Sequence, residues 1–528
     1  MKKMRVKKRQ IAKIISSLLI FIILFVFFIV VRSAGWYLDE FEGVELSVAI
    51  YQIVSPLKGT SSTVLWEYAY ACVFPALFFS IALLLLYRCY DAVMNKLYFD
   101  VHIQTYQYLT NSYKEHFFSF GKKFRKVSKI VLCFALMITI AVTLWKTAVQ
   151  VKLPEYIRQI SYTSELIETY YVDPEQVSVS FPEKKRNLIL IYMESMENTF
   201  ASKEVGGGEA VNYIPELTKL AEEGVSFSNT DMLGGTFVLG GTSWTIAALL
   251  AYQTGVPYKL PMASLADYQE FLPGLKGMGE ILQENGYQNY YMCGSDTTYG
   301  GRRNLFTHHG NYTVYDWLTA KEEGFIPDDY YVFWGMEDAK LYEYAKMHLA
   351  DIATSGQPFN LNILTADTHF PDGYFCELCE DEYDEQYANV VACASRQVYD
   401  FVEWAKDQEW YENTTIVIVG DHLSMNEGFF DTIDEFDRRA YNCFYNLPEN
   451  TEVGYVKNRE FNAMDLYPTI LVSIGASIPG EKLGLGTNLF SGDQTLQEQV
   501  GNWELNSELF MYSNFYFDKF VLDKNIEN

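Results

Sequence analysis

The chain has 528 residues, 49% of them hydrophobic and 16% aromatic, and its formal net charge at pH 7 is −26. The first 150 residues hold 18 Lys and Arg against 8 Asp and Glu, a net charge of +10, so the remainder carries −36. Such an acidic body repels phosphate backbones, which excludes a nucleic-acid-binding protein with a basic footprint.

Three apolar runs near the N-terminus have roughly the length that spans a membrane. They are Ile11–Val31, Ala69–Tyr87 and Ile130–Trp145. Basic residues crowd the segment before the first run and the loop between the last two, whereas the segment after the first run carries the acids Asp39, Glu40, Glu42 and Glu45. Because Lys and Arg favour the cytoplasmic side, we expect a multi-pass cell membrane protein whose body, after about residue 148, is extracytoplasmic.

A cleaved signal peptide is the alternative interpretation of the first apolar run, with Ser33-Ala34-Gly35 as the processing site. The run is long for a signal peptide and lacks a clear A-x-A pattern. The body is exported under either interpretation.

The sequence predicts three parts: a membrane anchor over residues 1–148, a juxtamembrane connector over 149–186 and an extracytoplasmic catalytic domain over 187–528. Beyond Asn187, short apolar runs alternate with helical segments, which is typical of an α/β fold with a mostly parallel sheet flanked by helices. The predicted strands are Asn187–Met193, Gln288–Cys293, Phe359–Thr365 and Thr414–Val419. The predicted helices are Ile214–Glu223, Gly277–Asn285, Asp338–Ala350, Tyr387–Gln408 and Asp465–Ile474.

A glycine-rich stretch, GGTFVLGGTSWTIAALLAYQTGVP over Gly234–Pro257, leads into a further predicted helix over Trp244–Tyr252. It delivers Thr242 and Ser243 to the helix start. Hydroxyls there lie beside unsatisfied N–H groups and the positive end of the helix dipole, which suits a phosphate or sulfate. The alternative is that one of these residues only caps the helix.

Polar side chains follow each predicted strand, at the edge of the sheet where ligands gather in open α/β folds. Glu194 follows the first strand, Arg302 lies beyond the second, His369 follows the third, and Asp421 and His422 follow the fourth. Carboxylate oxygens with an imidazole nitrogen suit Mn²⁺, Mg²⁺ or Zn²⁺. A divalent ion would lower the pKa of a threonine hydroxyl, which is otherwise a poor nucleophile.

Five cysteines fall in the exported body, in a compartment that favours disulfides. We expect a bridge between Cys379 and Cys393, with Cys376–Cys379 as the second choice. Zinc at this C-x-x-C pair is the remaining alternative, and no second C-x-x-C accompanies it.

Five motifs in fixed order behind a membrane anchor carry a family resemblance: RNLILIYMES, GGTSWTIAALLAYQTGVP, GGRRNLFTHHG, LTADTHFP and IVGDH. Together they resemble the lipoteichoic acid synthase and phosphoglycerol transferase family, within the alkaline phosphatase/sulfatase superfamily. The resemblance covers roughly residues 187–490 and is closest to the glucan-type phosphoglycerol transferases.

The resemblance implies roles position by position. The metal ligands match Glu194, Asp421 and His422, the nucleophile that also touches the metal matches Thr242, the substrate-binding histidine matches His369, and the glycerophosphate-binding arginine matches Arg302. Family members often carry a tryptophan two residues before that arginine, where this chain has Gly300.

Neighbouring residues leave alternatives open. Glu197 is the alternative to Glu194, Ser243 to Thr242 and Arg303 to Arg302. His308 and His309 are expected to pack or cap locally. Trp334 is not included in the predicted site.

The resemblance implies a transferase with a divalent cofactor, Mn²⁺ by preference. It would move phosphoglycerol from a phosphatidylglycerol-like lipid to a glycan or glycerophosphate acceptor through a phospho-threonine intermediate. A phosphoethanolamine transferase or another phosphodiesterase of the superfamily is the alternative. A sulfatase that matures a C/S-x-P-x-R motif is disfavoured, because Ser-Trp-Thr-Ile follows Thr242.

Overall fold

The computed structural model describes residues 2–40, 46, 49–50, 62–96, 99–108, 110–259, 271–430 and 436–524. These residues divide into two compact units, which meet in the chain between Glu155 and Tyr156. Each unit is described by itself below.

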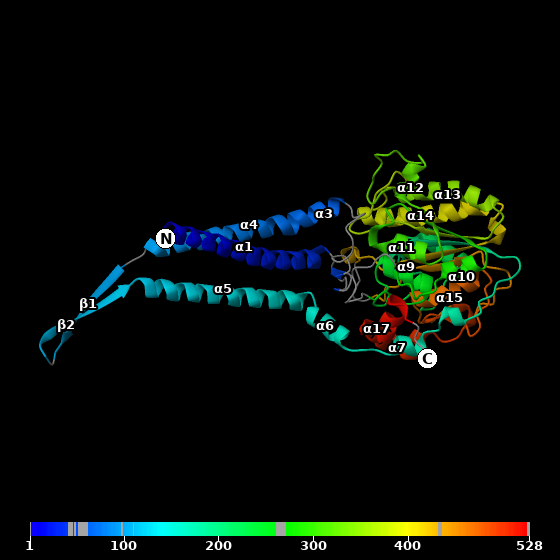
Figure 1. The fold of residues 1–528 in the computed structure, drawn as a ribbon. Coiled ribbons are helices and arrows are strands. Elements are labelled where there is room, and N and C mark those ends of the chain that lie inside the picture. The colour runs from blue at the N-terminus through cyan, green and yellow to red at the C-terminus, as the bar shows by residue number, and fades with distance from the viewer. Residues whose placement is uncertain are drawn as a thin grey trace. The chain divides into compact units, whose positions relative to one another are not determined.

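The first unit is built on long apolar helices (Figure 1). These are α1 (Lys2–Glu40), α3 (Ser62–Tyr68), which continues through a π turn (Ala69–Val73) into α4 (Phe74–Lys96), and α5 (Lys122–Gln150). Within them, Ile14–Asp39, Leu65–Met94 and Phe124–Gln150 are long and apolar enough to cross a membrane. The three predicted apolar spans are therefore present as helices.

A hairpin that the sequence analysis did not predict joins α4 to α5. It pairs β1 (Phe99–Gln107) with β2 (Ser112–Phe120) in antiparallel register. Its side chains are largely exposed on both faces, so no apolar alternation marks it in the sequence.

The second unit contains a six-stranded sheet in the order β5-β4-β6-β3-β7-β8. The strands are β3 (Asn187–Met193), β4 (Gln288–Cys293), β5 (Thr313–Tyr315), β6 (Phe359–Leu364), β7 (Thr414–Gly420) and β8 (Asn442–Tyr445). All neighbours are parallel except β7 and β8. The predicted α/β class and all four predicted strands are confirmed, and β5 and β8 are added.

Strand β3 lies at the centre of the sheet and is buried along its whole length. Leu188 and Leu190 point into one apolar core, and Ile189 and Ile191 point into a second core on the opposite face. A strand covered on both faces reads as a continuous apolar run, as NLILIYM does.

Helices cover both faces of the sheet (Figure 1). On the face of Leu188 lie α9 (Thr245–Thr254), α10 (Met278–Glu284) and α15 (Ala463–Ser473). On the face of Ile189 lie α8 (Pro215–Glu223), α13 (Asp338–Thr354) and α14 (Gln386–Lys406). The five helices predicted outside the glycine-rich stretch correspond to α8, α10, α13, α14 and α15, with ends that differ by a few residues.

Shorter elements complete the second unit. They are α6 (Leu153–Ser161), which begins in the first unit, α7 (Leu166–Tyr170), α11 (Arg302–His308), α12 (Trp317–Glu322), α16 (Leu496–Val500), α17 (Asn502–Phe510), β9 (Lys482–Leu483) and β10 (Gly486–Thr487).

Candidate metal centre and active site

Two neighbouring strands bring the predicted acidic and histidine side chains together. Because β3 and β7 are parallel and adjacent, Glu194 at the end of one meets Asp421 and His422 at the end of the other. His422 Nε2 lies 3.4 Å from an oxygen of Glu194 and 3.4 Å from Oδ2 of Asp421. All three side chains are buried, and their ligand atoms lie within 4.8 Å of one another.

The backbone after β3 is shaped to hold this cluster. Ser195 has a φ of 55°, in the left-handed region that residues other than glycine seldom adopt. In that conformation its N–H donates to Asp421 Oδ1 at 2.8 Å and its hydroxyl donates to Glu194 Oε1 at 2.9 Å. Local backbone strain of this kind persists where surrounding contacts enforce it, and here both contacts orient carboxylates.

The donor atoms of the cluster fit a divalent cation. His422 Nδ1 donates to the carbonyl of Leu423 at 2.8 Å, which leaves the lone pair of Nε2 facing the two carboxylates. Asp421 Oδ2 is buried and has no hydrogen-bond partner among the described residues. Two carboxylates and one imidazole form a ligand set that Mn²⁺, Mg²⁺ and Zn²⁺ accept.

The electrostatics of the cluster point the same way. Burial and the nearby charge of Glu194 raise the pKa of Asp421. Burial alone would lower the pKa of His422, but the charges of Asp421 and Glu194 outweigh it and raise this pKa. Two buried carboxylates at this separation repel each other, and a positive charge between them, either a proton or a cation, relieves the repulsion.

The hydroxyl of Thr242 makes no hydrogen bond to Glu194, Asp421 or His422. Helix α9 begins at Thr245, with Trp244 as its N-cap residue. Thr242 lies in the turn before the helix, where its hydroxyl donates to the carbonyl of Leu239 at 2.9 Å and accepts the N–H of Leu239 at 3.0 Å. Both contacts are internal to the turn.

Thr245 instead presents its hydroxyl to the cluster. Its Oγ1 donates to Glu194 Oε2 at 3.3 Å and lies 3.5 Å from His422 Nε2. Thr245 was not singled out from the sequence, because the family motif matches Thr242 and Thr245 was counted in the apolar run of the predicted helix. The available signal was its position one helical turn after Thr242.

Two glycines of the same stretch allow its backbone to pack closely against the rest of the protein. A side chain at Gly240 would lie 2.3 Å from the ring of Phe510. Gly241 has a φ of 79°, and a side chain there would meet the carbonyl of Tyr258 at 2.8 Å. The hydroxyl of Ser243 is buried and has no hydrogen-bond partner among the described residues.

Glu197, the sequence alternative to Glu194, is committed elsewhere. Arg438 donates to both of its oxygens, at 2.8 and 2.6 Å, and the N–H of Ser424 donates to Oε1 at 2.9 Å. This bidentate pair is almost fully buried. Glu197 therefore braces the loop after His422, and Glu194 is the acid that faces the centre.

The adjacent arginines Arg302 and Arg303 have different partners. Arg303 pairs with the buried carboxylate of Asp316 at 2.8 Å, where Asp316 caps α12. Arg302 is buried and donates to the carbonyls of Tyr299 at 3.1 Å and Asp296 at 2.9 Å. Unlike Arg303, Arg302 has no carboxylate partner among the described residues, so its guanidinium charge is not neutralised by an ion pair.

His369 lies half-buried beyond the end of β6, beside a set of aromatic rings. Its Nδ1 donates to the carbonyl of Phe370 at 2.9 Å, so Nε2 carries the lone pair. The ring of Trp334 lies 4.9 Å from that of His369 and 5.6 Å from that of Tyr299. Trp334, which the sequence analysis left out, therefore supplies a large aromatic ring next to His369 and the Tyr299-Gly300 turn.

His308 and His309 hold a neighbouring segment of backbone. His308 Nδ1 accepts the N–H of Phe271 at 3.0 Å, and His309 Nε2 donates to the carbonyl of Phe271 at 2.6 Å. Their roles are local, as expected.

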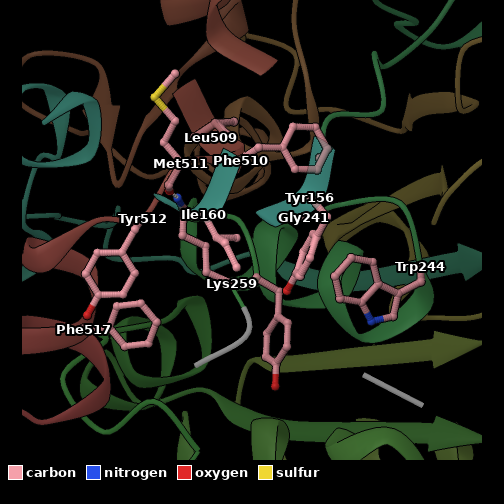
Figure 2. Close-up of a pocket in the computed structure, with 12 residues that line it drawn as sticks. Tyr156, Ile160, Gly241, Trp244, Lys259, Leu509, Phe510, Met511, Tyr512 and Phe517 are labelled. Carbon is pink, nitrogen blue, oxygen red and sulfur yellow. Dashed lines mark hydrogen bonds between the residues drawn. The ribbon is translucent and has the colours of Figure 1, made fainter. Parts of the chain in front are cut away.

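A small cavity lies against the residue before Thr245 (Figure 2). Its volume is about 70 Å³, and its lining includes Trp244, Lys259, Phe510 and Tyr512. Lys259 is partly buried there and its Nζ donates to the carbonyl of Met511. The cavity accommodates a small apolar group and is too small for a whole acyl chain.

Comparison with known proteins matches most of the second unit to one family model and to named relatives. A family model described as Sulfatase matches residues 186–474. Phosphoglycerol transferase I from two Escherichia coli strains is 32% identical to the chain over 340 residues, which cover 62% of this chain and 42% of the relative. The chain therefore matches less than half the length of these relatives.

Two solved structures resemble the second unit at low identity. A protein of the alkaline phosphatase superfamily from Vibrio parahaemolyticus has a TM-score of 0.46 and 18% identity, covering 59% of this chain and 74% of that one. The lipoteichoic acid synthase LtaP from Listeria monocytogenes has a TM-score of 0.45 and 19% identity, covering 62% of this chain and 82% of that one.

Proposed function

The chain belongs to the sulfatase family, and we propose that it is a metal-dependent transferase that moves phosphoglycerol from a phosphatidylglycerol-like lipid to a hydroxyl acceptor outside the cytoplasm. The observation that carries the proposal is the contact of the Thr245 hydroxyl, on the first turn of α9, with Glu194 and His422. The relatives named phosphoglycerol transferase I support this choice of transferred group.

Glu194, Asp421 and His422 would hold one divalent ion, Mn²⁺ by preference, with Mg²⁺ and Zn²⁺ as alternatives. When bound, the ion would lower the pKa of the nearby threonine hydroxyl and offset negative charge on the phosphate. Thr245 takes the role of nucleophile that the sequence analysis gave to Thr242.

In the first step, the Thr245 hydroxyl loses its proton to solvent, its oxygen attacks the phosphorus of the lipid, and the bond to the diacylglycerol oxygen breaks. The products are diacylglycerol and a phosphoglycerol ester of Thr245. His369, through Nε2, protonates the departing oxygen when it is charged and accepts a hydrogen bond from a glycerol hydroxyl when it is neutral. Arg302 donates to a phosphate oxygen, since a guanidinium matches that geometry.

In the second step, an acceptor hydroxyl attacks the phosphorus and Thr245 is released. The acceptor is a glycan or a growing glycerophosphate chain. Transfer outcompetes hydrolysis only if the acceptor is held in an attacking position. The rings of Trp334 and Tyr299 offer an apolar surface for a sugar or glycerol next to His369.

The membrane helices fit a lipid donor. We assign residues 1–148 to an anchor, 149–186 to a connector and 187–528 to an extracytoplasmic catalytic domain, with the N-terminus in the cytoplasm. The small cavity beside Trp244 would take only the part of the lipid nearest the phosphate, because of its size.

The test uses the full chain in mixed micelles with phosphatidylglycerol labelled in the headgroup glycerol, with and without Mn²⁺. We expect metal-dependent release of diacylglycerol and transfer of label to an added glycan or glycerophosphate. Asp421→Asn should abolish both, and Asp407→Asn, at an exposed helix end, should match the wild type. Release from phosphatidylethanolamine in preference to phosphatidylglycerol would reassign the donor, and no release from either would contradict the proposal.

A further inference from the structure

Three cysteines converge in the second unit and form a group distinct from the carboxylate cluster. Cys376 and Cys379 stand at the two ends of a turn closed by the Cys379 N–H and the Cys376 carbonyl at 3.1 Å, and Cys393 lies on α14. The Cys376 sulfur is 3.6 Å from that of Cys379 and 3.8 Å from that of Cys393. All three sulfurs lie within 4.8 Å of one another.

All three thiols are free, so the predicted Cys379–Cys393 bridge is not formed in the structure. The reason is the turn, which brings the sulfur of Cys376 next to both of the others. Any single disulfide would therefore leave a third thiol beside it.

The measured separations are those of ligands around one metal ion. Zinc–thiolate bonds are about 2.3 Å long, and two corners of a tetrahedron with that radius are about 3.8 Å apart. A disulfide requires about 2.05 Å between sulfurs. The separations of 3.6 and 3.8 Å match the tetrahedral edge.

The surroundings stabilise thiolates and offer a further donor. Gln397, one helical turn after Cys393, directs its Nε2 to the Cys393 sulfur at 3.2 Å and toward the Cys376 sulfur at 3.6 Å. The N–H of Cys376 donates to the Cys379 sulfur at 3.3 Å. Gln397 is buried, and its Oε1 has no hydrogen-bond partner among the described residues.

We propose that Cys376, Cys379 and Cys393 form a structural zinc site that is separate from the active centre. The three thiols lose their protons on binding, and the three thiolates take three tetrahedral positions. The fourth position falls to water, which reaches the half-exposed Cys379, or to Gln397 Oε1 after a rotation of its amide.

The site would tie two functional parts of the fold together. The C-x-x-C turn belongs to the segment that leaves His369, and Cys393 is part of the long helix α14 that packs on the sheet. A metal clip across them would fix the segment that carries His369 without touching the substrate. Its sulfur donors select zinc, whereas the oxygen-rich active centre accepts harder ions.

The test measures zinc in the full chain purified with reductant and without chelator, in an Asp421→Asn background so that metal at the active centre is not counted. We expect about one zinc per chain. Cys376→Ser and Cys379→Ser should each reduce it at least tenfold. Cys443→Ser, which changes a buried cysteine on β8, is the matched control and should retain it.

Cobalt provides a second readout on folded protein. Co²⁺ added to the metal-free chain should produce thiolate-to-cobalt absorption, and Cys379→Ser, at the most exposed of the three positions, should weaken it while the thermal unfolding transition is retained. The proposal is overturned if the chain holds no zinc and gives no such absorption. It is equally overturned if non-reducing peptide mapping of protein isolated without reductant shows two of these cysteines joined in a disulfide.

Discussion

The hydroxyl of Thr245 donates to the carboxylate of Glu194 at 3.3 Å, although 51 residues separate the two in the chain. One residue begins helix α9, and the other follows the central strand β3. The buried side chains of helix α9 pack on the face of the sheet that carries Leu188 and Leu190 of β3. The N-terminus of α9 therefore lies near the end of that strand. The contact thus joins an acid, a hydroxyl and the positive end of a helix dipole at one point.

The first prediction separates the two threonines. Thr245→Ala should lower diacylglycerol release at least a hundredfold, because the attacking oxygen is gone, while Thr245→Ser should keep part of the activity. Thr242→Ala should remain active and lose about 1 kcal/mol of stability, because only hydrogen bonds within its turn are removed. Release rates and thermal unfolding of the three variants check this. An inactive Thr242→Ala with an active Thr245→Ala would restore the sequence-based assignment.

The second prediction concerns metal binding. Added Mn²⁺ should raise the unfolding temperature of the wild type, since a ligand that binds only the folded state stabilises it. Glu194→Gln and Asp421→Asn should remove this increase. Asp407→Asn should leave it unchanged. The same increase in Asp421→Asn as in the wild type would exclude this carboxylate as a ligand.

The third prediction distinguishes the two arginines. Arg302→Ala should reduce kcat/KM by 10- to 100-fold, because a charge-assisted contact to phosphate is worth about 1.5–3 kcal/mol. Arg303→Ala should mainly lower stability, since it leaves the buried Asp316 without its ionic partner. Kinetics and thermal unfolding of both variants provide the check. A larger kinetic loss in Arg303→Ala than in Arg302→Ala would exchange their roles.

The fourth prediction uses the lysine of the small cavity. Burial lowers the pKa of Lys259 to about 7, whereas an unfolded lysine titrates near about 10.4. The folded state therefore binds this proton less tightly. This difference lowers the free energy of unfolding. The loss is fully present below pH 7 and disappears as the pH rises toward 10.

Lys259→Met should accordingly raise the unfolding temperature at pH 6.5, and the gain should shrink steadily as the pH approaches 10. The cost removed is at most about 5 kcal/mol, partly offset by the lost hydrogen bond to Met511. Lys184→Met, at an exposed position, is the control. A gain that does not change with pH would contradict the buried-lysine account.

The residues of the metal cluster could be located from the sequence because each follows a fully buried strand, and such a strand appears as a continuous apolar run. NLILIYM and TTIVIVG are unbroken apolar runs, and the acids that follow them had to meet once the strands were neighbours. That β3 and β7 are neighbours was an assumption, which the observed strand order β6-β3-β7 confirms. Shorter β5 and β8 carry too few residues to show a pattern.

The sequence could not show with the same precision which threonine hydroxyl lies at the metal cluster. Thr242 was selected because it matches the nucleophile in the family motif, and a motif match does not show which hydroxyl of the stretch contacts Glu194. Glu194 was the predicted ligand, and Glu197 remained its alternative until the ion pair with Arg438 accounted for it. The arrangement of Cys376, Cys379 and Cys393 depends on the turn between Cys376 and Cys379, and the spacing of the cysteines in the sequence does not specify the geometry of that turn.

Mapping the covalent intermediate tests the central claim most directly. The full chain, incubated with Mn²⁺ and headgroup-labelled phosphatidylglycerol in the absence of acceptor, is quenched in acid, digested and sequenced by mass spectrometry. The account predicts a phosphoglycerol ester on Thr245 in the wild type, absent from Asp421→Asn and discharged when acceptor is added before the quench. The same ester on Thr242 or Ser243, or turnover with no labelled peptide at any time, would contradict it.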